Sequence, residues 1–213
     1  MNDRTDAPAD FRSREGDAAM GSFENKYPWE LCTTITEGAW GYQPGAKVKS
    51  FDQLIRLLVG AVGRDGNMLL NVGPRPDGEL VPEQVQRLRE IGDWLRTYGE
   101  SIYSTRGGPY LPGDYGVSTY RGNTIYLHIL NNPGNRLSLP PLPARVLSCK
   151  ALTGGQATCT QTVAGVDITF TGNNTQPTPV DTIVALALET PAAGISPIAT
   201  ANEASAIAPI AKK

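Results

Sequence analysis

The chain has 213 residues, of which 40% are hydrophobic and 19% are charged, and its formal net charge at pH 7 is −2. That length is enough for one large domain or two small ones. The near-neutral charge excludes the basic surface typical of nucleic-acid binding, and no apolar run is long enough to cross a membrane. We therefore expect neither nucleic-acid binding nor membrane insertion. The first residues are polar and charged, so no signal peptide is visible.

The first predicted helix begins after Ser50. Ser50 and Gln53 have the spacing of a capping box, in which each side chain bonds the backbone N–H of the other residue. Apolar residues then recur with helical spacing and form one broad stripe. The stretch 63–66, with a glycine at each end, predicts the end of this helix.

A strand and a second helix are predicted next along the chain. Residues 67–72 form a short apolar run that is typical of a strand covered on both faces. The second helix has Pro82 at its first position and extends to Gly99. Helix, buried strand and helix joined by short loops predict a parallel α/β sheet or barrel.

Beyond residue 105 the pattern changes to short strands separated by Gly, Pro and Asn. Residues 117–120 and 124–130 flank an Arg-Gly-Asn turn and predict a hairpin. Further strands are predicted at 145–149, 166–170 and 182–188. Strands in this spacing, with no helix between them, indicate a small antiparallel sandwich.

The chain thus divides into an α/β part at residues 1–105, an all-β part at residues 106–190 and a tail at residues 191–213. The tail is rich in small residues, and we expect it to be disordered. A complete (β/α)8 barrel needs roughly 250 residues. The first part is much shorter, so it forms either a smaller open sheet or the C-terminal piece of a larger barrel.

The three cysteines, Cys32, Cys149 and Cys159, are too few and too far apart for a zinc site of the paired C-x-x-C kind. Cys149 and Cys159 flank a predicted turn at 153–155, so they either form a disulfide across a hairpin or remain reduced. The single histidine, His128, lies on a predicted strand, and we expect no catalytic role for it.

Several separate motifs follow one another in the first half of the chain. They are WELCTT at 29–34, WGY at 40–42, GNMLLNVGP at 66–74 and YGESIY at 98–103. In identity, order and spacing they resemble the C-terminal part of an α-L-fucosidase of glycoside hydrolase family 29. The resemblance covers residues 2 to about 188.

This resemblance implies a fold of the α/β plus all-β class. Residues 1–105 would be the C-terminal part of a (β/α)8-like barrel, and residues 106–190 an antiparallel β-sandwich. The implied activity is the release of terminal L-fucose from a fucosylated glycan or oligosaccharide, with no cofactor and no metal. The family resemblance also implies an extracellular, periplasmic or lysosomal location.

Family members use a retaining mechanism with two carboxyl groups, a nucleophilic Asp and an acid/base, on opposite sides of the scissile bond. The family's nucleophile lies on an earlier barrel strand in a W-x-D motif, and this sequence contains no such motif. A complete site would therefore need the missing N-terminal half of the barrel. The alternative function is a non-catalytic carbohydrate-binding or interaction module, or a pseudo-enzyme.

The resemblance implies a catalytic role for Glu15. Asp10-Phe11, with Glu15 four residues beyond Phe11, resembles the family's D-F/Y-x-x-x-E segment, in which the Glu is the acid/base. Ser13-Arg14 stands where the family has Thr-Pro, which leaves Glu24 and Glu30 as alternatives. Glu15 could also be a solvated loop carboxylate or part of a surface ion pair with its arginine neighbours.

Two further residues are implied to bind the sugar. Asn2-Asp3-Arg4 resembles the family's N-D-R segment, in which the arginine, here Arg4, reaches the sugar pocket. Trp40 falls where the family presents an aromatic ring, which suits the methyl group of a deoxy-sugar; packing under the barrel mouth is the alternative. Asn67 and Asn71 bracket a predicted strand, and we expect them to satisfy loop backbone groups. Half a barrel would leave strand edges uncovered, so we expect poor solubility or association.

Overall fold

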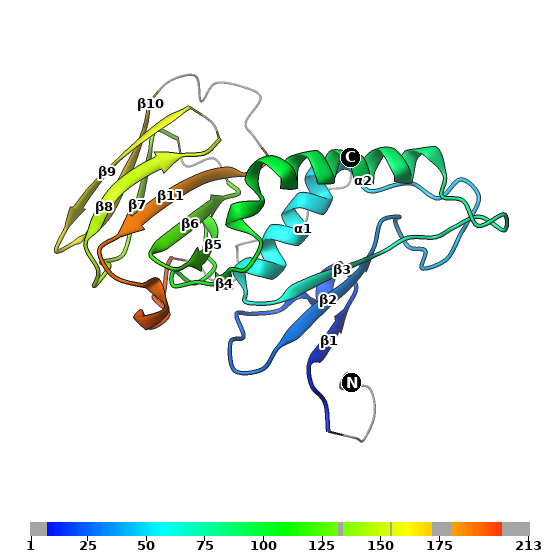
Figure 1. Ribbon diagram of the computed structural model, residues 1–213, viewed down its shortest axis with the longest axis horizontal. Helices are drawn as coiled ribbons and strands as arrows, with labels where there is room; N and C mark the ends of the chain where they lie inside the picture. The colour runs from blue at the N-terminus through cyan, green and yellow to red at the C-terminus, as the bar shows by residue number, and fades with distance from the viewer. Residues whose placement is uncertain (1–7, 132–133, 154, 172–179, 202–213) are drawn as a thin grey trace.

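The computed structural model describes residues 8–131, 134–153, 155–171 and 180–201. It shows two regions (Figure 1). The parallel region contains a three-stranded sheet with its helices, and the antiparallel region contains a five-stranded and a second three-stranded sheet. The coarse expectation of an α/β part followed by an all-β part is confirmed.

The parallel region is built on the sheet β1-β2-β3. Its strands are β1 (Arg12–Glu15), β2 (Trp29–Thr34) and β3 (Asn67–Asn71), all parallel. Helix α1 (Phe51–Gly63) connects β2 to β3, and α2 (Pro82–Tyr98) follows β3. The described residues of this region close no barrel.

The predicted helix boundaries are confirmed. The Ser50 hydroxyl accepts the Gln53 backbone N–H, and the Gln53 side chain accepts the Ser50 backbone N–H, so the capping box is complete. Helix α2 starts at Pro82, and the Gly99 backbone N–H at its other end donates to the carbonyl of Leu95. Gly99 opens the short 3-10 helix η2 (Gly99–Ser101).

The expectation that β3 is covered on both faces is wrong. Met68 and Leu70 pack into a core with α1, but Leu69, which points the other way, is 43% exposed. Helices cover one face of the sheet, and among the described residues no layer covers the other. We call this second face, which includes Glu15, Cys32 and Leu69, the open face.

Among the described residues, the antiparallel region has eight strands in two sheets. The five-stranded sheet has the order β4 (Arg106–Gly107), β5 (Gly116–Arg121), β6 (Thr124–Ile129), β11 (Thr182–Leu188), β8 (Val146–Ala151). The smaller sheet has the order β7 (Arg136–Leu139), β10 (Gly165–Thr171), β9 (Gln156–Thr162). The predicted hairpin is β5-β6, and the three further predicted strands correspond to β8, β10 and β11.

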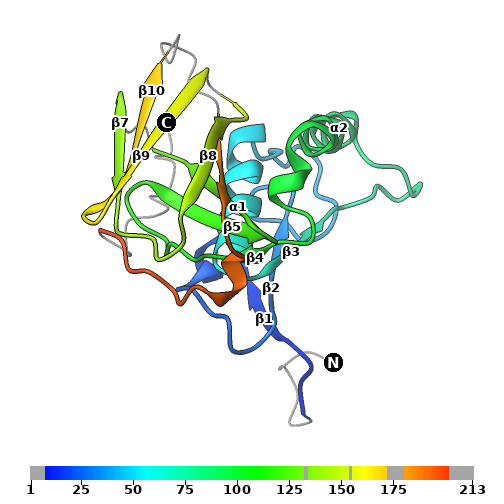
Figure 2. The same ribbon diagram turned by 60° about the vertical axis from the view of Figure 1, so that its left-hand side comes forward.

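The central strands of the five-stranded sheet, β5, β6 and β11, are buried on both faces. Ile125, Leu127 and Leu186 share a core with the smaller sheet, whereas Tyr126 and Ile183, which alternate with them, share a core with α1 and α2. Figure 2 shows the smaller sheet, the five-stranded sheet and the helices following one another across the molecule. The antiparallel region therefore supplies part of the core on which the parallel region rests.

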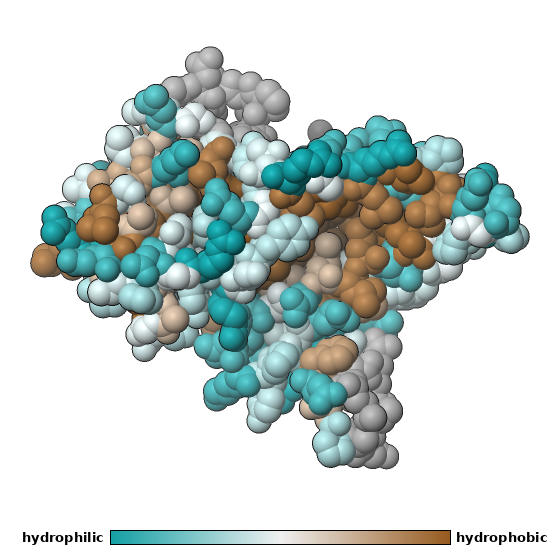
Figure 3. Space-filling model, in the orientation of Figure 1, coloured by the Kyte–Doolittle hydropathy of each residue, from teal (hydrophilic) through white to brown (hydrophobic). Residues whose placement is uncertain are grey.

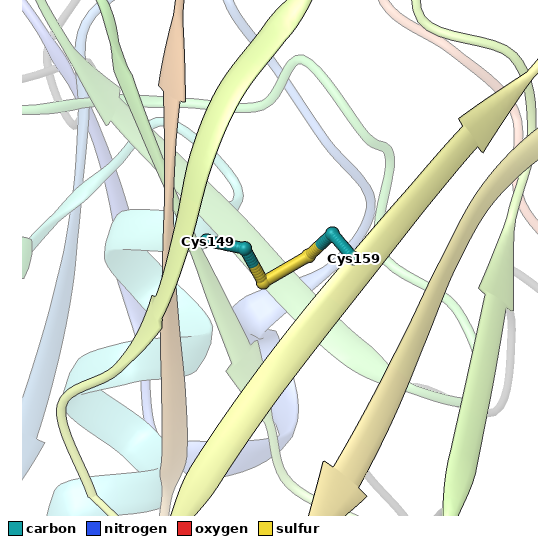
Figure 4. The surroundings of a disulfide bond; sticks show 2 residues. All are labelled: Cys149 and Cys159. Carbon is teal, nitrogen blue, oxygen red and sulfur yellow. A yellow bond between two sulfur atoms is a disulfide. The ribbon is translucent and has the colours of Figure 1, made fainter.

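Cys149 and Cys159 form a disulfide with their Cα atoms 5.8 Å apart, so the disulfide alternative is correct (Figure 4). The bond joins β8 to β9, which are edge strands of different sheets. It therefore fastens the two sheets of the antiparallel region together at one side, instead of closing a hairpin within one sheet.

Residues 191–201, which were expected to be part of a disordered tail, pack against the antiparallel region. They include the short 3-10 helix η3 (Ala192–Gly194), whose Ala192 is fully buried. The Ile198 backbone N–H donates to the Pro109 carbonyl and the Ile198 carbonyl accepts from Leu111, both at 2.8 Å. Residues 202–213 lie outside the described residues.

Candidate active site

The carboxyl ends of the three parallel strands lie at one edge of the sheet, which we call the carboxyl edge. Glu15 ends β1 and lies beside Cys32 of β2, while Thr34 at the end of β2 lies beside Asn71 at the end of β3. In parallel α/β folds this is the edge at which ligands and substrates bind. Side chains here are the first candidates for chemistry.

Glu15 is exposed at the carboxyl edge, on the open face. Arg12 and Arg14 alternate with it and lie on the opposite face, where Arg12 stacks on the Tyr27 ring at 4.4 Å and Arg14 on the Trp29 ring at 3.9 Å. Partial burial lowers the pKa of Arg14. The two arginines thus help to fix β1 against β2, with the Glu15 carboxylate presented on the other side.

The alternative Glu30 lies at the wrong end of the sheet for this site. Its neighbours across the sheet are Ser13 and Asn67, and Asn67 is the first residue of β3. Glu30 shares the open face with Glu15 but is close to the amino ends of the strands.

The alternative Glu24 also lies toward the amino ends. Its backbone N–H donates to the carbonyl of Arg64, which shortly precedes β3. Its carboxylate accepts the Lys26 backbone N–H at 2.8 Å, which lowers its pKa, and it lies 3.6 Å from Arg12. Of the three candidate carboxylates, only Glu15 lies at the carboxyl edge.

A buried lysine anchors the segment that follows Glu15. Lys49 is only 6% exposed, and its Nζ lies 2.7 Å from Asp17 Oδ1 and 3.0 Å from Thr33 Oγ1. Asp17 begins the 3-10 helix η1 (Asp17–Met20), directly after β1. This network ties the ends of β1 and β2 to the start of α1. Sequence reasoning missed it, because the three partners are far apart in the chain and form no local motif.

Trp40 lies in the loop after β2, at the same edge. We call residues 40–42 the aromatic loop; Trp40 is 45% exposed and Tyr42 38% exposed. The Asn71 side-chain amide donates to the Trp40 carbonyl at 2.6 Å, so Asn71 satisfies a loop backbone group as expected. A Cβ at Gly73 would come within 2.8 Å of the Gly41 backbone, so only glycine allows this approach.

Glu15 and the aromatic loop are therefore brought to one edge. Glu15 ends β1, and the aromatic loop is hydrogen-bonded to the end of β3; these two strands are two strand spacings apart, which corresponds to about 10 Å. A carboxyl group can transfer a proton there, and an exposed indole offers an apolar face to a sugar ring. Arg4 lies outside the described residues.

Other kinds of site have less support among the described residues. No group of three or more His, Cys, Asp or Glu side chains is placed to hold a metal ion there. Within the same residues, no helix is long and apolar enough to cross a membrane.

Comparison with known proteins shows similarity to one family. The family model described as alpha-L-fucosidase matches residues 1–100. Human tissue alpha-L-fucosidase is 40% identical over 115 residues, which is 51% of this chain and 25% of that protein. The alpha-L-fucosidase of Branchiostoma floridae is 39% identical over 84 residues, 38% of this chain and 19% of that protein.

Solved structures match a larger share of the chain. Alpha-L-fucosidase isoenzyme 1 from Paenibacillus thiaminolyticus has a TM-score of 0.72 and 29% identity, covering 84% of this chain and 45% of that structure. A GH29 alpha-L-fucosidase of Bacteroides thetaiotaomicron, trapped as a covalent intermediate, has a TM-score of 0.73 and 26% identity. The match covers 85% of this chain and 44% of that structure.

These matches make the chain similar to glycoside hydrolases. More narrowly, it is similar to the α-L-fucosidases of glycoside hydrolase family 29. The chain spans at most a quarter of the length of these curated relatives and less than half of these solved structures.

Proposed function

We propose that this chain supplies the acid/base and a sugar-binding surface to a retaining α-L-fucosidase that releases terminal L-fucose from glycoconjugates or oligosaccharides. The observation that carries the proposal is the position of Glu15 at the carboxyl edge, which it shares with Trp40. In this proposal, residues 1–105 are the C-terminal part of a (β/α)8-like barrel, and residues 106–190 form a β-sandwich beside it.

In the proposed reaction Glu15 acts twice. Its carboxyl group first protonates the glycosidic oxygen while a nucleophilic carboxylate attacks the anomeric carbon, and it then deprotonates the water that hydrolyses the glycosyl-enzyme intermediate. The two carboxyl groups must be about 5–5.5 Å apart for this mechanism. The nucleophile comes from a part of the family fold other than this chain, so we expect the chain to be inactive by itself.

Two residues bind the sugar in this proposal. The exposed indole of Trp40 packs against the apolar face and methyl group of fucose. Arg4, which matches the family's N-D-R segment, donates hydrogen bonds to the sugar.

We also propose that the chain works outside the cytosol, in an extracellular, periplasmic or lysosomal compartment. Two of its relatives are named plasma and tissue alpha-L-fucosidase. The Cys149–Cys159 disulfide supports the same location, because disulfides persist in oxidising compartments.

The decisive test is Glu15→Gln in a full-length family enzyme that carries this segment. Removing the acid slows the cleavage of poor leaving groups most, so natural fucosides should lose more kcat/KM than aryl fucosides with good leaving groups. Glu24→Gln and Glu30→Gln are the matched controls and should show no such leaving-group dependence. Equal slowing of both substrate types by Glu15→Gln would contradict the acid/base role.

Calorimetric titration of the isolated chain with fucose tests the binding-module alternative, which the lack of a W-x-D motif favours. A partial site is expected to give no isotherm. A clear isotherm, combined with full activity of the Glu15→Gln enzyme, would show that the chain is a carbohydrate-binding module.

A further inference from the structure

The loop between β2 and the aromatic residues is held at both ends by Asn71. One contact is made by the Asn71 backbone carbonyl and the other by the Asn71 side chain. The carbonyl of Asn71 accepts the Ile35 backbone N–H at 2.9 Å, just after β2 ends. Its side-chain amide donates to the Trp40 carbonyl at 2.6 Å. Asn71 therefore brackets residues 35–40, and it does so from the last position of β3.

The interior of this loop is ordered by its own hydrogen bonds. The Thr36 hydroxyl donates to the Ala39 carbonyl at 2.9 Å, and Thr36 forms an isolated β-bridge with Val48. Beyond Trp40, the close approach of Gly73 fixes the Gly41 backbone. At Trp40 itself, a hydrogen bond from the Asn71 side chain links the loop to the sheet.

Trp40 is 45% exposed, so packing covers only part of it. Its location relative to Glu15 therefore also depends on the backbone that carries it. A binding or catalytic group has to be held to within about 0.5 Å by the residues that support it. Asn71 is placed to provide that support.

We propose that Asn71 is a positioning residue, which holds Trp40 at the carboxyl edge so that its ring can contact the sugar. The proposal rests on the proposed function for the sugar contact, but its structural part is independent of it. Asn71 does not touch the substrate in this account; it acts through Trp40.

The first experiment uses the chain as it is. Asn71→Asp keeps the size of the side chain but replaces the donor with a carboxylate that cannot donate to the Trp40 carbonyl. Time-resolved tryptophan anisotropy should then show a larger fast depolarising component. Trp29 and Trp94 are buried and should contribute little to it, and the component should be absent in the Trp40→Phe background. An unchanged anisotropy decay would overturn the proposal.

The matched control is Asn67→Asp, at the opposite end of the same strand and on the same face. It introduces the same charge but should leave the fast component unchanged, which separates a local effect from a general loosening of β3. An equal increase in both variants would also overturn the positioning role.

The second experiment uses a full-length family enzyme that carries the segment. Asn71→Asp removes one hydrogen bond that positions Trp40. We therefore expect KM for an aryl fucoside to rise about 2- to 10-fold, with kcat less affected. Asn71→Gln, which keeps the amide, should restore part of this loss. Greater Trp40 motion with an unchanged KM would refute the sugar contact of Trp40, which is part of the proposed function. The positioning of Trp40 by Asn71 would still stand.

Discussion

The two regions of the molecule differ in how their sheets are covered. The five-stranded sheet of the antiparallel region has a hydrophobic core on each face. The parallel sheet has a core on one face only, and Leu69 on its open face is 43% exposed. On the side seen in Figure 3, apolar side chains also gather beneath α2, next to the parallel sheet. The region with the candidate site is thus the less completely buried one.

This difference shows where the stability of the chain lies. The core beneath α1 includes Val117 and Tyr126 of the antiparallel region, so the parallel region depends on its neighbour. The antiparallel region has a second core made from its own residues and a disulfide. Changes at the junction or in the antiparallel region should therefore cost more stability than changes on the open face.

The largest loss is expected at the buried junction between the regions. His128 and Asp181 are both fully buried, and His128 Nδ1 lies 2.6 Å from Asp181 Oδ2. His128 Nε2 lies 3.3 Å from the Ser101 carbonyl, in the segment after α2. His128→Ala leaves Asp181 buried without this partner, which costs about 3–5 kcal/mol of unfolding free energy in denaturant titration.

A double variant separates the stability lost by breaking the His128–Asp181 pair from the stability lost by altering the core. Replacing both partners with apolar residues, His128→Leu with Asp181→Leu, should recover much of the stability lost in His128→Ala. If the double variant were less stable than His128→Ala, the pair would not be the reason for the loss.

The second largest effect is expected from the disulfide. Cys149→Ala with Cys159→Ala should lower the unfolding free energy by about 2–4 kcal/mol, because the unfolded chain loses a cross-link. Cys32→Ala, which changes the reduced cysteine on the open face, is the control and should change little. A reductant should lower the melting temperature of the wild-type chain but not that of the double variant; equal shifts in both would rule out this role for the bond.

The helices and most of the antiparallel strands could be predicted, because their signals are local. The capping box of α1, the proline of α2 and the turn between β5 and β6 each lie within a few residues. β4, β7 and β9 were not predicted, because β4 and β7 have only two and four residues, and β9 is mostly polar with no buried residue. The open face of β3 was missed for another reason: an apolar run does not reveal whether a second layer is present.

The candidate site was predictable only through the family resemblance. Local pattern cannot show that Glu15 is at the carboxyl edge while Glu24 and Glu30 are not, since that depends on strand pairing. The link between Asn71 and Trp40 spans 31 positions in the sequence and has no local signature either.

Self-association tests the open face directly. Uncovered apolar surface and unpaired strand edges promote association, so the chain should form oligomers in sedimentation velocity. Leu69→Lys should reduce this association without lowering the melting temperature. Leu147→Lys is the matched control, because Leu147 is 60% exposed on β8 of the antiparallel region. If Leu147→Lys were as effective as Leu69→Lys, association would not be specific to the open face.

The smallest effect is expected from an exposed charge cluster on the smaller antiparallel sheet. Hydrogen bonds from Arg136 and then Ser138 lower the pKa of Asp167, with Arg136 Nη2 at 2.7 Å and Ser138 Oγ at 2.6 Å. A carboxyl group whose pKa is lower in the folded state stabilises the fold above its unfolded pKa of about 3.9, and this stabilisation is lost as the pH falls through the folded pKa. Asp167→Asn should therefore lower the melting temperature slightly at neutral pH and match the wild type in strong acid. A difference that persisted in strong acid would mean that Asp167 acts through packing and not through its charge.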